Sequence, residues 1–412
     1  MIAKLYKTSI KIITSLSFSL GVISLASAIP VYATSTGSVG SWTTEANTLP
    51  VQTAESSSVM YNGRVYVLGG EYHSTNGFVY LNTVYSAPLN ANGSVGAWTT
   101  EANALPSALT SATAVVNNGF IYVIGGFNGT SDVNTVYSAP LNANGSVGAW
   151  TTEANALPIS LDGASSSVYS GHIYLMGGYS AANSSIVNTV YSAPLNANGS
   201  VGAWTTEANA LPVQIYKATS LLNNGFVYVL GGISFGNVEI SAVYSAPINA
   251  NGSVGTWTTE ANALPITLLA ATSVAYNSHA YVLGGNSNSS SYAAGASTAV
   301  YSAPLNANGS VGAWTTEANA LPVPIENATS VLYNGRAYIL GGTNGFTWYN
   351  TVYSASLVPQ SSGGSTSTTV LGVPDTGFSN LVTNAKETTI KSVIAVVAIL
   401  SLAYLSRKRL KN

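Results

Sequence analysis

One block of 23 residues occurs five times in this 412-residue chain with almost no change. The copies begin at Val84, Val136, Val190, Val243 and Val300, so they follow one another at intervals of 52, 54, 53 and 57 residues. A sixth copy is divided: residues 37–50 carry its second half and residues 351–357 carry its first half. Periods of this size are typical of propellers and solenoids, whose units cannot bury their apolar faces alone. A solenoid needs polar caps, whereas the two chain ends of a closed ring share one unit, so the divided copy predicts a ring.

Each unit contains the sequence of a β-hairpin followed by two glycines. In the first unit, the strand-forming runs 57–61 and 64–68 are separated by Asn62-Gly63. Asn-Gly between two such runs is the strongest short hairpin signal, since both turn residues need a positive φ. The pair Gly69-Gly70 then permits close approach of another backbone segment. The equivalent pairs are Gly125-Gly126, Gly177-Gly178, Gly231-Gly232, Gly284-Gly285 and Gly341-Gly342.

A second hairpin is expected in each unit. Residues 83–86 are predicted to form a third strand and Trp98 to lie in a fourth, with a turn at Asn92-Gly93 between them. The tryptophan of each unit supplies apolar surface that packs one unit against the next. These residues are Trp42, Trp98, Trp150, Trp204, Trp257 and Trp314. Four strands in each of six units predict an all-β, six-bladed β-propeller, in which residues 38–45 complete the blade begun by residues 323–357.

The order of these residues resembles the kelch family. A hydrophobic run into Gly-Gly, a tyrosine in the next strand and a later tryptophan recur six times within residues 37–357. The tyrosines are Tyr85, Tyr137, Tyr191, Tyr244, Tyr301 and Tyr353. Tyr85 and Trp98 are thirteen residues apart, which is longer than usual in kelch repeats, so an extended hairpin is expected between the third and fourth strands. The resemblance implies blades of the four-stranded kelch type.

The N-terminal end has the sequence of a secretory signal peptide. Lys4, Lys7 and Lys11 precede an apolar stretch that runs from Ile12 to about Ala28, and residues 31–33 fit a small-residue cleavage site. Residues 1–33 are therefore predicted to be a signal peptide, and residues 34–358 to form the propeller. The alternative is a first helix that is buried in the fold.

The C-terminal end resembles the cell-wall sorting signals that sortases cut in Gram-positive bacteria. After a Ser/Thr/Gly-rich stalk at residues 359–372, the chain carries the motif Val373, Pro374, Asp375, Thr376 and Gly377. A polar spacer, an apolar run over residues 393–405 and a basic tail follow. Val373 stands where the family has leucine, and the spacer is long for such a signal. The resemblance implies sortase and cell-wall peptidoglycan as partners.

The same apolar run is the candidate membrane segment of residues 373–412. As a helix, the run spans about 20 Å, which is less than the hydrocarbon core of about 30 Å. A transmembrane helix over about residues 388–406, with Lys391 reaching the interface, approaches spanning length. The basic tail is then expected in the cytoplasm and the propeller outside the cell. Cleavage with attachment to the cell wall and a permanent membrane anchor are both open, and either places the protein at the cell surface.

Few residues could carry chemistry or bind a metal. His73, His172 and His279 are the only histidines, they lie in different units without metal-ligand spacing, and cysteine is absent. Propeller enzymes that resemble galactose oxidase need a cysteine, and propeller sialidases need a cluster of arginines, whereas the ring contains only Arg64 and Arg336. The sequence therefore predicts no enzyme activity, no metal and no cofactor.

Carboxylates fall into repeated and single positions. A glutamate occupies one position of successive units, which indicates a structural role; the residues are Glu101, Glu153, Glu207, Glu260 and Glu317. Two pairs at single positions could perform acid/base chemistry as in a glycosidase: Glu55 with Glu326, or Glu71 with Asp162. No catalytic residue is assigned. Residues 34–360 hold twelve acids against three bases, and this net charge of −9 argues against nucleic acid as a partner.

The loops on one face of the ring differ from unit to unit, whereas those on the other face are nearly identical. The variable face carries the linkers between blades and the loops after Gly-Gly. These loops have either drifted freely or been recruited for binding. Their aromatic side chains suit sugar faces or protein partners. The candidate ligand-binding residues, expected around one mouth of the central channel, are Tyr72, Phe127, Tyr179, Phe235, Phe346 and Trp348.

Together these features predict a secreted, surface-anchored, kelch-like propeller that acts as a ligand-binding or adhesion module. The ligand is expected to be an extracellular protein or a glycan. Two other classes are open: an extracellular carbohydrate-active enzyme, which would turn over glycans, and a structural surface-layer component, which would self-associate without any ligand.

Overall fold

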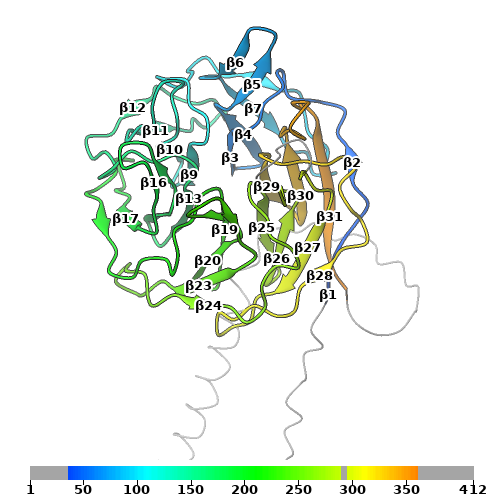
Figure 1. The fold of residues 1–412 in the computed structure, drawn as a ribbon. Coiled ribbons are helices and arrows are strands. Elements are labelled where there is room, and N and C mark those ends of the chain that lie inside the picture. Colours follow the sequence, from blue (N-terminus) through cyan, green and yellow to red (C-terminus); the bar gives the residue numbers. More distant parts are fainter. Residues whose placement is uncertain (1–35, 289–294, 361–412) are drawn as a thin grey trace, which may run out of the picture. The chain divides into compact units, whose positions relative to one another are not determined.

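In the computed structural model, residues 36–288 and 295–360 are described, and they form a six-bladed β-propeller (Figure 1). The blades surround a central channel, and the first strand of each blade lies next to that channel. The described residues contain strands and turns but no helix, so none of them forms a helix that could cross a membrane. The predicted signal peptide, the sorting motif and the membrane helix all lie outside the described residues.

Every blade is an antiparallel sheet with its strands in chain order from the channel outward. Blade 1 consists of β3 Ser57–Tyr61, β4 Arg64–Leu68, β7 Val84–Pro88 and β8 Thr99–Thr100. Blade 2 consists of β9 Thr113–Asn117, β10 Phe120–Ile124, β11 Val136–Pro140 and β12 Thr151–Thr152. Blade 3 consists of β13 Ser165–Tyr169, β14 His172–Met176, β17 Val190–Pro194 and β18 Thr205–Thr206.

The next two blades repeat this pattern. Blade 4 consists of β19 Thr219–Asn223, β20 Phe226–Leu230, β23 Val243–Pro247 and β24 Thr258–Thr259. Blade 5 consists of β25 Thr272–Tyr276, β26 His279–Leu283, β27 Val300–Pro304 and β28 Thr315–Thr316. Three short hairpins follow Gly-Gly pairs: β5 Glu71–Ser74 with β6 Gly77–Tyr80, β15 Tyr179–Ser180 with β16 Ser185–Ile186, and β21 Ile233–Ser234 with β22 Val238–Glu239.

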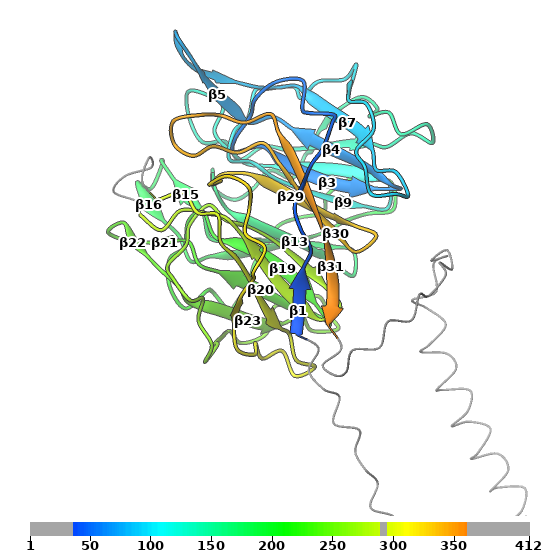
Figure 2. The same cartoon turned by 90° about the vertical axis from the view of Figure 1, so that its right-hand side faces the viewer.

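Blade 6 joins the two ends of the ring, which confirms the prediction from the divided repeat. It contains β29 Thr329–Tyr333, β30 Arg336–Leu340 and β31 Val352–Gln360. The N-terminal strands β1 Thr36–Val39 and β2 Thr43–Thr44 both pair antiparallel with β31. Figure 2 shows β1 beside β31 at the edge of this blade. The last blade therefore takes its outer strands from the beginning of the chain.

The two hairpins of a blade differ in their turns. Asn62 and Gly63 both have a positive φ, 47° and 71°, as expected for the tight turn. At the second hairpin only Gly93 has a positive φ, and a longer turn is closed by the bridge between Leu89 and Val95. The expectation that Trp98 lies in the fourth strand is wrong, because that strand contains only Thr99 and Thr100 and the tryptophan precedes it. The extended turn brings the indole to the boundary with the neighbouring blade, where its ring nitrogen donates to the main chain.

The apolar core lies between neighbouring blades. Tyr66 and Leu68 of blade 1, for example, share a buried cluster with Ile121 and Val123 of blade 2. The tyrosine in the middle of every second strand is fully buried; these residues are Tyr66, Tyr122, Tyr174, Tyr228, Tyr281 and Tyr338. Burial of aromatic side chains on both faces of each sheet makes a blade dependent on its two neighbours.

A polar clamp repeats at all six blade boundaries. At the boundary of blades 1 and 2, buried Glu101 accepts a hydrogen bond from Ser86 of its own blade and one of 2.9 Å from the Val147 N–H of the next. Asn103 donates to the Val147 carbonyl at 2.9 Å, and Trp150 Nε1 donates to the Asn103 carbonyl at 3.0 Å. At the ring closure, Glu317, Asn319 and Trp42 make the same contacts across blades 5 and 6. The repeated glutamates are thus structural, as their spacing indicates.

The glycine pairs form a second contact between blades. Gly70 N–H donates to the Leu109 carbonyl of the following linker at 2.7 Å. A Cβ atom on Gly69, whose φ is +61°, would lie 2.3 Å from the same oxygen. The first glycine is therefore required both by its conformation and by the carbonyl that approaches it.

Candidate functional site at the channel mouth

A circle of backbone hydrogen bonds surrounds the channel on the variable face. The residue two positions before each first strand has a φ between 51° and 55°, and its N–H donates to the carbonyl of the equivalent residue in the preceding blade. The six bonds are 2.8–3.0 Å long and close on themselves. The residues of this circle, which we call the mouth circle, are Glu55, Ser111, Gly163, Lys217, Ala270 and Asn327. Because the main chain holds the circle together, its side chains are free to differ.

Below the mouth circle, the channel is polar. It forms a cavity of about 250 Å³ lined by serine, threonine and alanine from the six first strands. Hydroxyl groups of neighbouring strands bond to each other; Thr219 and Ser273, for instance, are 2.6 Å apart. The channel wall therefore offers few unpaired groups to a ligand, and the varied chemistry lies at the mouth.

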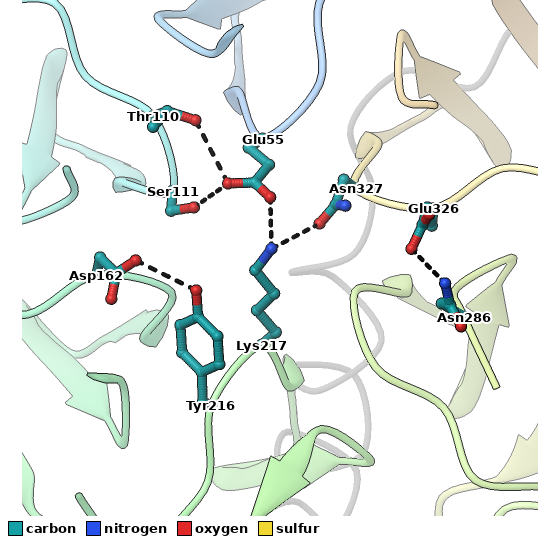
Figure 3. A network of polar contacts seen from close by, with 9 residues as sticks. All are labelled: Glu55, Thr110, Ser111, Asp162, Tyr216, Lys217, Asn286, Glu326 and Asn327. Atoms are coloured by element: carbon teal, nitrogen blue, oxygen red, sulfur yellow. Dashed lines mark hydrogen bonds and ion pairs between the residues drawn. The ribbon is translucent and has the colours of Figure 1, made fainter. Parts of the chain in front are cut away.

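Two charged members of the mouth circle reach across the channel. Lys217 of blade 4 forms an ion pair with Glu55 of blade 1, three blades away, and its Nζ lies 3.4 Å from Asn327 Oδ1 (Figure 3). Ser111 and Thr110 also donate to the Glu55 carboxylate. Burial by itself would raise the pKa of Glu55, but the Lys217 ammonium and these hydrogen bonds hold it below its usual range. Glu55 therefore carries a negative charge that Lys217 balances.

A second cavity, of about 260 Å³, opens beside this ion pair and toward blades 1 and 6. We call it the mouth cavity. The side chains that define its chemistry are Glu55, Glu71, Phe78, Lys217, Glu326 and Trp348. They come from the mouth circle, from the β5–β6 hairpin and from the linker and loop that flank blade 6. Three carboxylates, one ammonium and two aromatic rings therefore face one space.

The surroundings of Glu71 and Glu326, which form no ion pair with Lys217, disfavour the charged form of their carboxyl groups. Burial, and then the nearby Glu55 carboxylate, raise the pKa of Glu71 to about 7. Glu326 is 1% exposed, and this burial raises the pKa of its carboxyl group. A 2.8 Å hydrogen bond from Asn286 acts in the opposite direction and lowers it. Among the described residues, Glu326 Oε1 and Trp348 Nε1 have no hydrogen-bond partner. The cavity thus presents one unused acceptor and one unused donor.

Aromatic rings form one continuous wall at this mouth. The His73 ring stacks on Trp348 with centroids 5.6 Å apart, and Phe78 contacts the same indole edge-on at 6.1 Å. Phe78 also stacks on Tyr80, which in turn contacts Phe127 of blade 2. Two of the predicted ligand-binding residues, Trp348 and Phe127, therefore belong to one cluster, linked by the hairpin that follows the first Gly-Gly pair.

The other predicted ligand-binding residues lie on the variable face but outside this cluster. Tyr72 is half-buried on β5, and Tyr179 pairs with Tyr216 at 6.1 Å near blade 4. Phe235 and Phe346 are 72% and 73% exposed at loop tips. The structure thus places one of the six predicted residues, Trp348, in the mouth cavity and connects Phe127 to it through the aromatic cluster, while the other four are distributed around the face.

Of the two predicted carboxylate pairs, the structure brings three members together and leaves the fourth apart. Glu55, Glu326 and Glu71 line the mouth cavity, whereas Asp162 accepts a 3.2 Å hydrogen bond from Tyr216 on the far side of Lys217 (Figure 3). Burial and the neighbouring Asp132 raise the pKa of Asp162 to about 7.

The histidines occupy separate blades, with His172 and His279 at the start of second strands, and the described residues contain no cluster of three potential metal ligands.

No motif or repeated position in the sequence indicates a role for Lys217. The available signal was its position, because alignment of the six copies puts six different residue types two positions before the first strand. A position that tolerates glutamate, serine, glycine, lysine, alanine and asparagine has no shared side-chain function, so an ion pair between two of its members could not be read from the repeat.

Comparison with known proteins agrees with this architecture. Residues 108–138, which include β9, β10 and the start of β11, match the kelch motif. The chain is 26% identical over 304 residues to "Kelch-like protein terF" of Aspergillus terreus, covering 70% of this chain and 60% of that protein. It is 36% identical over 118 residues to "Kelch repeat and BTB domain-containing protein 1" of camelpox virus, covering 28% of this chain and 19% of the viral protein.

A solved propeller has the same overall arrangement. The structure titled "Structure of YjhT" superposes with a TM-score of 0.59 at 17% sequence identity, covering 75% of this chain and 95% of that one. The chain spans about three fifths of the fungal relative and about one fifth of the viral one, so these likenesses concern the ring and not the whole relatives. The described part of this chain is a six-bladed β-propeller that contains a match to the kelch motif and is similar to kelch-like proteins.

Proposed function

We propose that this protein is an extracellular binding module that holds a carbohydrate ligand in the mouth cavity of its propeller. The observation that carries the proposal is the convergence of an aromatic wall, three carboxylates and two unused hydrogen-bonding atoms on one cavity of about 260 Å³. Small-molecule sites are typically concave, partly apolar and equipped with a few well-placed polar groups.

A sugar suits this combination of groups. The flat apolar face of a sugar ring can lie against Trp348 and Phe78, and its hydroxyl groups can both donate and accept hydrogen bonds. Glu326 Oε1 needs a donor, whereas Trp348 Nε1 needs an acceptor. A ligand with many hydroxyl groups can satisfy both atoms at once.

The binding experiment uses a glycan array on the full-length protein, followed by titration of the best ligand. Replacing Trp348 and Phe127 together by alanine removes the two ends of the aromatic wall. We expect affinity to fall about ten- to a hundredfold, since each stacked ring contributes about 0.5–1.5 kcal/mol and about 1.4 kcal/mol corresponds to a factor of ten. The fold should be kept, because both side chains lie outside the blade core.

The matched control is on the opposite face. Asn144 Oδ1 accepts hydrogen bonds of 3.0 and 2.8 Å from Ser146 within a repeated turn, so Asn144→Ala should lower stability and leave affinity unchanged. Loss of binding in Asn144→Ala with normal binding in the aromatic variant would place the ligand on the wrong face and refute the proposal.

Export and anchoring complete the proposed function and rest on sequence alone. The N-terminal 33 residues have the pattern of a signal peptide, and residues 373–412 have the order of a sorting signal. A sortase would cut between Thr376 and Gly377, so replacing both by alanine should move the protein from the cell-wall fraction to the membrane fraction. Equal recovery of mutant and wild type in the wall fraction would leave a plain membrane anchor as the explanation.

One observation favours a second candidate, an extracellular carbohydrate-active enzyme. Glu71, with a pKa of about 7, and ionised Glu55 face the same cavity, and glycoside hydrolysis uses one protonated and one ionised carboxyl group. Release of reducing sugar from a bound glycan by the wild type, abolished in Glu71→Gln, would favour this candidate. Tight binding without turnover in both proteins would favour the binding module.

A further inference from the structure

The charges of the described residues are unevenly placed. Six of the twelve acids form the clamps between blades, and the other six lie in linkers and loops of the variable face. The acids of the variable face are Glu55, Glu71, Asp132, Asp162, Glu239 and Glu326. Within residues 36–288 and 295–360, Lys217 is the only cation on that face, because Arg64 and Arg336 begin second strands at the opposite end of their blades. A ligand approaching the mouth therefore meets a strongly negative surface.

The mouth cavity also contains more acidic than basic side chains. Lys217 forms its ion pair with Glu55, so the one ammonium that lines the mouth cavity faces three carboxyl groups, those of Glu55, Glu71 and Glu326. Glu71 is half-buried, and Glu326, which is almost fully buried, has no hydrogen-bond partner at Oε1 among the described residues. Such carboxylates are stabilised most by a positive charge that also donates hydrogen bonds.

Resting on the proposed carbohydrate-binding function, we propose that the mouth cavity binds an amino sugar whose amino group is free and protonated. The ammonium supplies the donor that Glu326 Oε1 needs and faces the Glu71 carboxylate. A hydroxyl or ring oxygen supplies the acceptor for Trp348 Nε1. The sugar ring rests against Trp348 and Phe78, where the aromatic faces also attract a cation.

Other ligands satisfy fewer of these groups. A lysine side chain brings an ammonium but has no acceptor for Trp348 Nε1. A neutral sugar offers hydroxyl groups but leaves the negative charge of the cavity uncompensated. A sugar acid would add a further carboxylate beside Glu71 and Glu326, which like-charge repulsion opposes. The protonated amino sugar is the class that meets all three requirements.

The test titrates the full-length protein with three tetrasaccharides that share one backbone. They are a β1,4-linked glucosamine tetramer, its fully N-acetylated form and the corresponding glucose tetramer. Acetylation removes the charge and keeps the ring, and glucose lacks the nitrogen altogether. We expect the glucosamine tetramer to bind at least about tenfold more tightly than either of the others, which corresponds to about 1.4 kcal/mol. Nα-acetyl-lysine amide, as the fourth probe, should bind more weakly than the glucosamine tetramer.

Two variants assign the preference to the cavity. Glu326→Gln keeps the size of the side chain and an acceptor for Asn286 but removes the charge, so the ratio between the glucosamine and glucose tetramers should fall toward one. Glu239→Gln makes the same chemical change on the variable face outside the mouth cavity and should leave that ratio unchanged. Trp348→Phe keeps an aromatic ring, although a smaller one, and removes the Nε1–H, so it should weaken all three tetrasaccharides to a similar extent.

The outcomes separate this inference from the proposed function. Equal binding of the three tetrasaccharides, or preference for the acetylated or glucose form, refutes the amino-sugar assignment and keeps the carbohydrate module. Preference for the lysine derivative over the glucosamine tetramer refutes the assignment in favour of a protein ligand. An unchanged ratio in Glu326→Gln, with the protein folded, refutes the cavity as the source of the preference. No binding of any sugar by the wild type refutes both.

Discussion

At the scale of single residues, glutamate has two different roles in this ring. Glutamates that directly follow the short fourth strands are buried and accept hydrogen bonds from a serine of their own blade and from a main-chain N–H of the next blade; Glu153, for example, accepts from Ser138 and from Val201 N–H. Glutamates of the mouth, such as Glu71 and Glu326, have few or weak partners and face a cavity. The partners, and not the residue type, distinguish a structural carboxylate from one available to a ligand.

Removing one clamp carboxylate should destabilise the ring. Glu153→Ala leaves the Ser138 hydroxyl and the Val201 N–H without their acceptor in a buried place. We expect the free energy of unfolding to fall by about 1–3 kcal/mol, the usual cost of buried polar groups that lose their partner. Urea denaturation measures this, with Thr152→Ala, an exposed position of the adjacent strand, as a control expected to stay within about 0.5 kcal/mol of wild type. An equal stability of Glu153→Ala and wild type would show that the clamp contributes little.

The raised carboxyl pKa values predict how stability depends on pH. Glu71 and Asp162 both have a pKa of about 7 in the folded protein, above the ordinary values of 4.5 for glutamate and 3.8 for aspartate. Between those values the folded protein binds more protons than the unfolded chain, so the stability contributed by these groups is complete at low pH and is lost as pH rises through about 7. We expect the decrease in melting temperature from about pH 5 to about pH 8 to be smaller in Glu71→Gln/Asp162→Asn than in wild type.

Two comparisons make that measurement specific. Glu55 acts in the opposite sense, because its lowered pKa gives stability that is lost below about pH 4.5, so the scan should remain above that pH. Asn76→Ala, an exposed change on the same face that involves no titratable group, should keep the wild-type pH dependence. If the double variant shows the full wild-type decrease, the burial of Glu71 and Asp162 does not control the proton balance of folding.

At the scale of strands and turns, the glycine pairs show how a local conformation serves the contact between blades. Gly125 combines a φ of +61° with a Leu161 carbonyl oxygen 2.4 Å from the position of an added Cβ. Gly171, in the first hairpin turn of blade 3, has a similar φ of +74° but has no atom within 4 Å of that position. Substitution of these two glycines by alanine therefore distinguishes the energetic cost of a positive φ from the cost of a steric contact with the neighbouring linker.

Alanine at these two glycines should have unequal effects. Gly171→Ala carries only the cost of a left-handed conformation, about 1–2 kcal/mol. Gly125→Ala carries that cost and also forces the neighbouring linker away from the blade, so its loss of stability should be clearly larger. Chemical denaturation of both variants tests this order. A loss in Gly171→Ala equal to or greater than that in Gly125→Ala would show that the contact with Leu161 is easily relaxed.

At the scale of the whole molecule, closure depends on residues from both ends of the described chain. Deletion of residues 37–50 removes most of β1, all of β2 and Trp42, which donates to Asn319 of the preceding blade. The remaining β31 would expose an unpaired edge, and exposed edges promote association between sheets. We expect the deletion variant to aggregate and to melt at a lower temperature in size-exclusion and thermal experiments. A monomeric variant with an unchanged melting temperature would contradict closure by these strands.

Repetition explains which features the sequence could predict. Six copies reveal whatever is common to all blades, so the blade number, the split sixth blade, the glycine pairs and the structural glutamates followed from spacing. The two-residue fourth strand and the position of Trp98 did not, because the turn at residues 90–94 is longer than an Asn-Gly pair alone indicates. Lys217, Glu55 and the cavity beside them depend on positions where the copies differ and on contacts between opposite blades, and one sequence contains no signal for such contacts.

Hydrogen–deuterium exchange of the full-length protein, with and without the glucosamine tetramer, tests the binding account most directly. Amides that a ligand covers or orders exchange more slowly. The account predicts slower exchange in residues 53–58, 71–80 and 343–349, which surround the mouth cavity, and unchanged exchange in the repeated turns at residues 90–94 and 142–146 of the opposite face. Protection confined to the repeated turns, or exchange that is the same with and without every sugar tested, would contradict it.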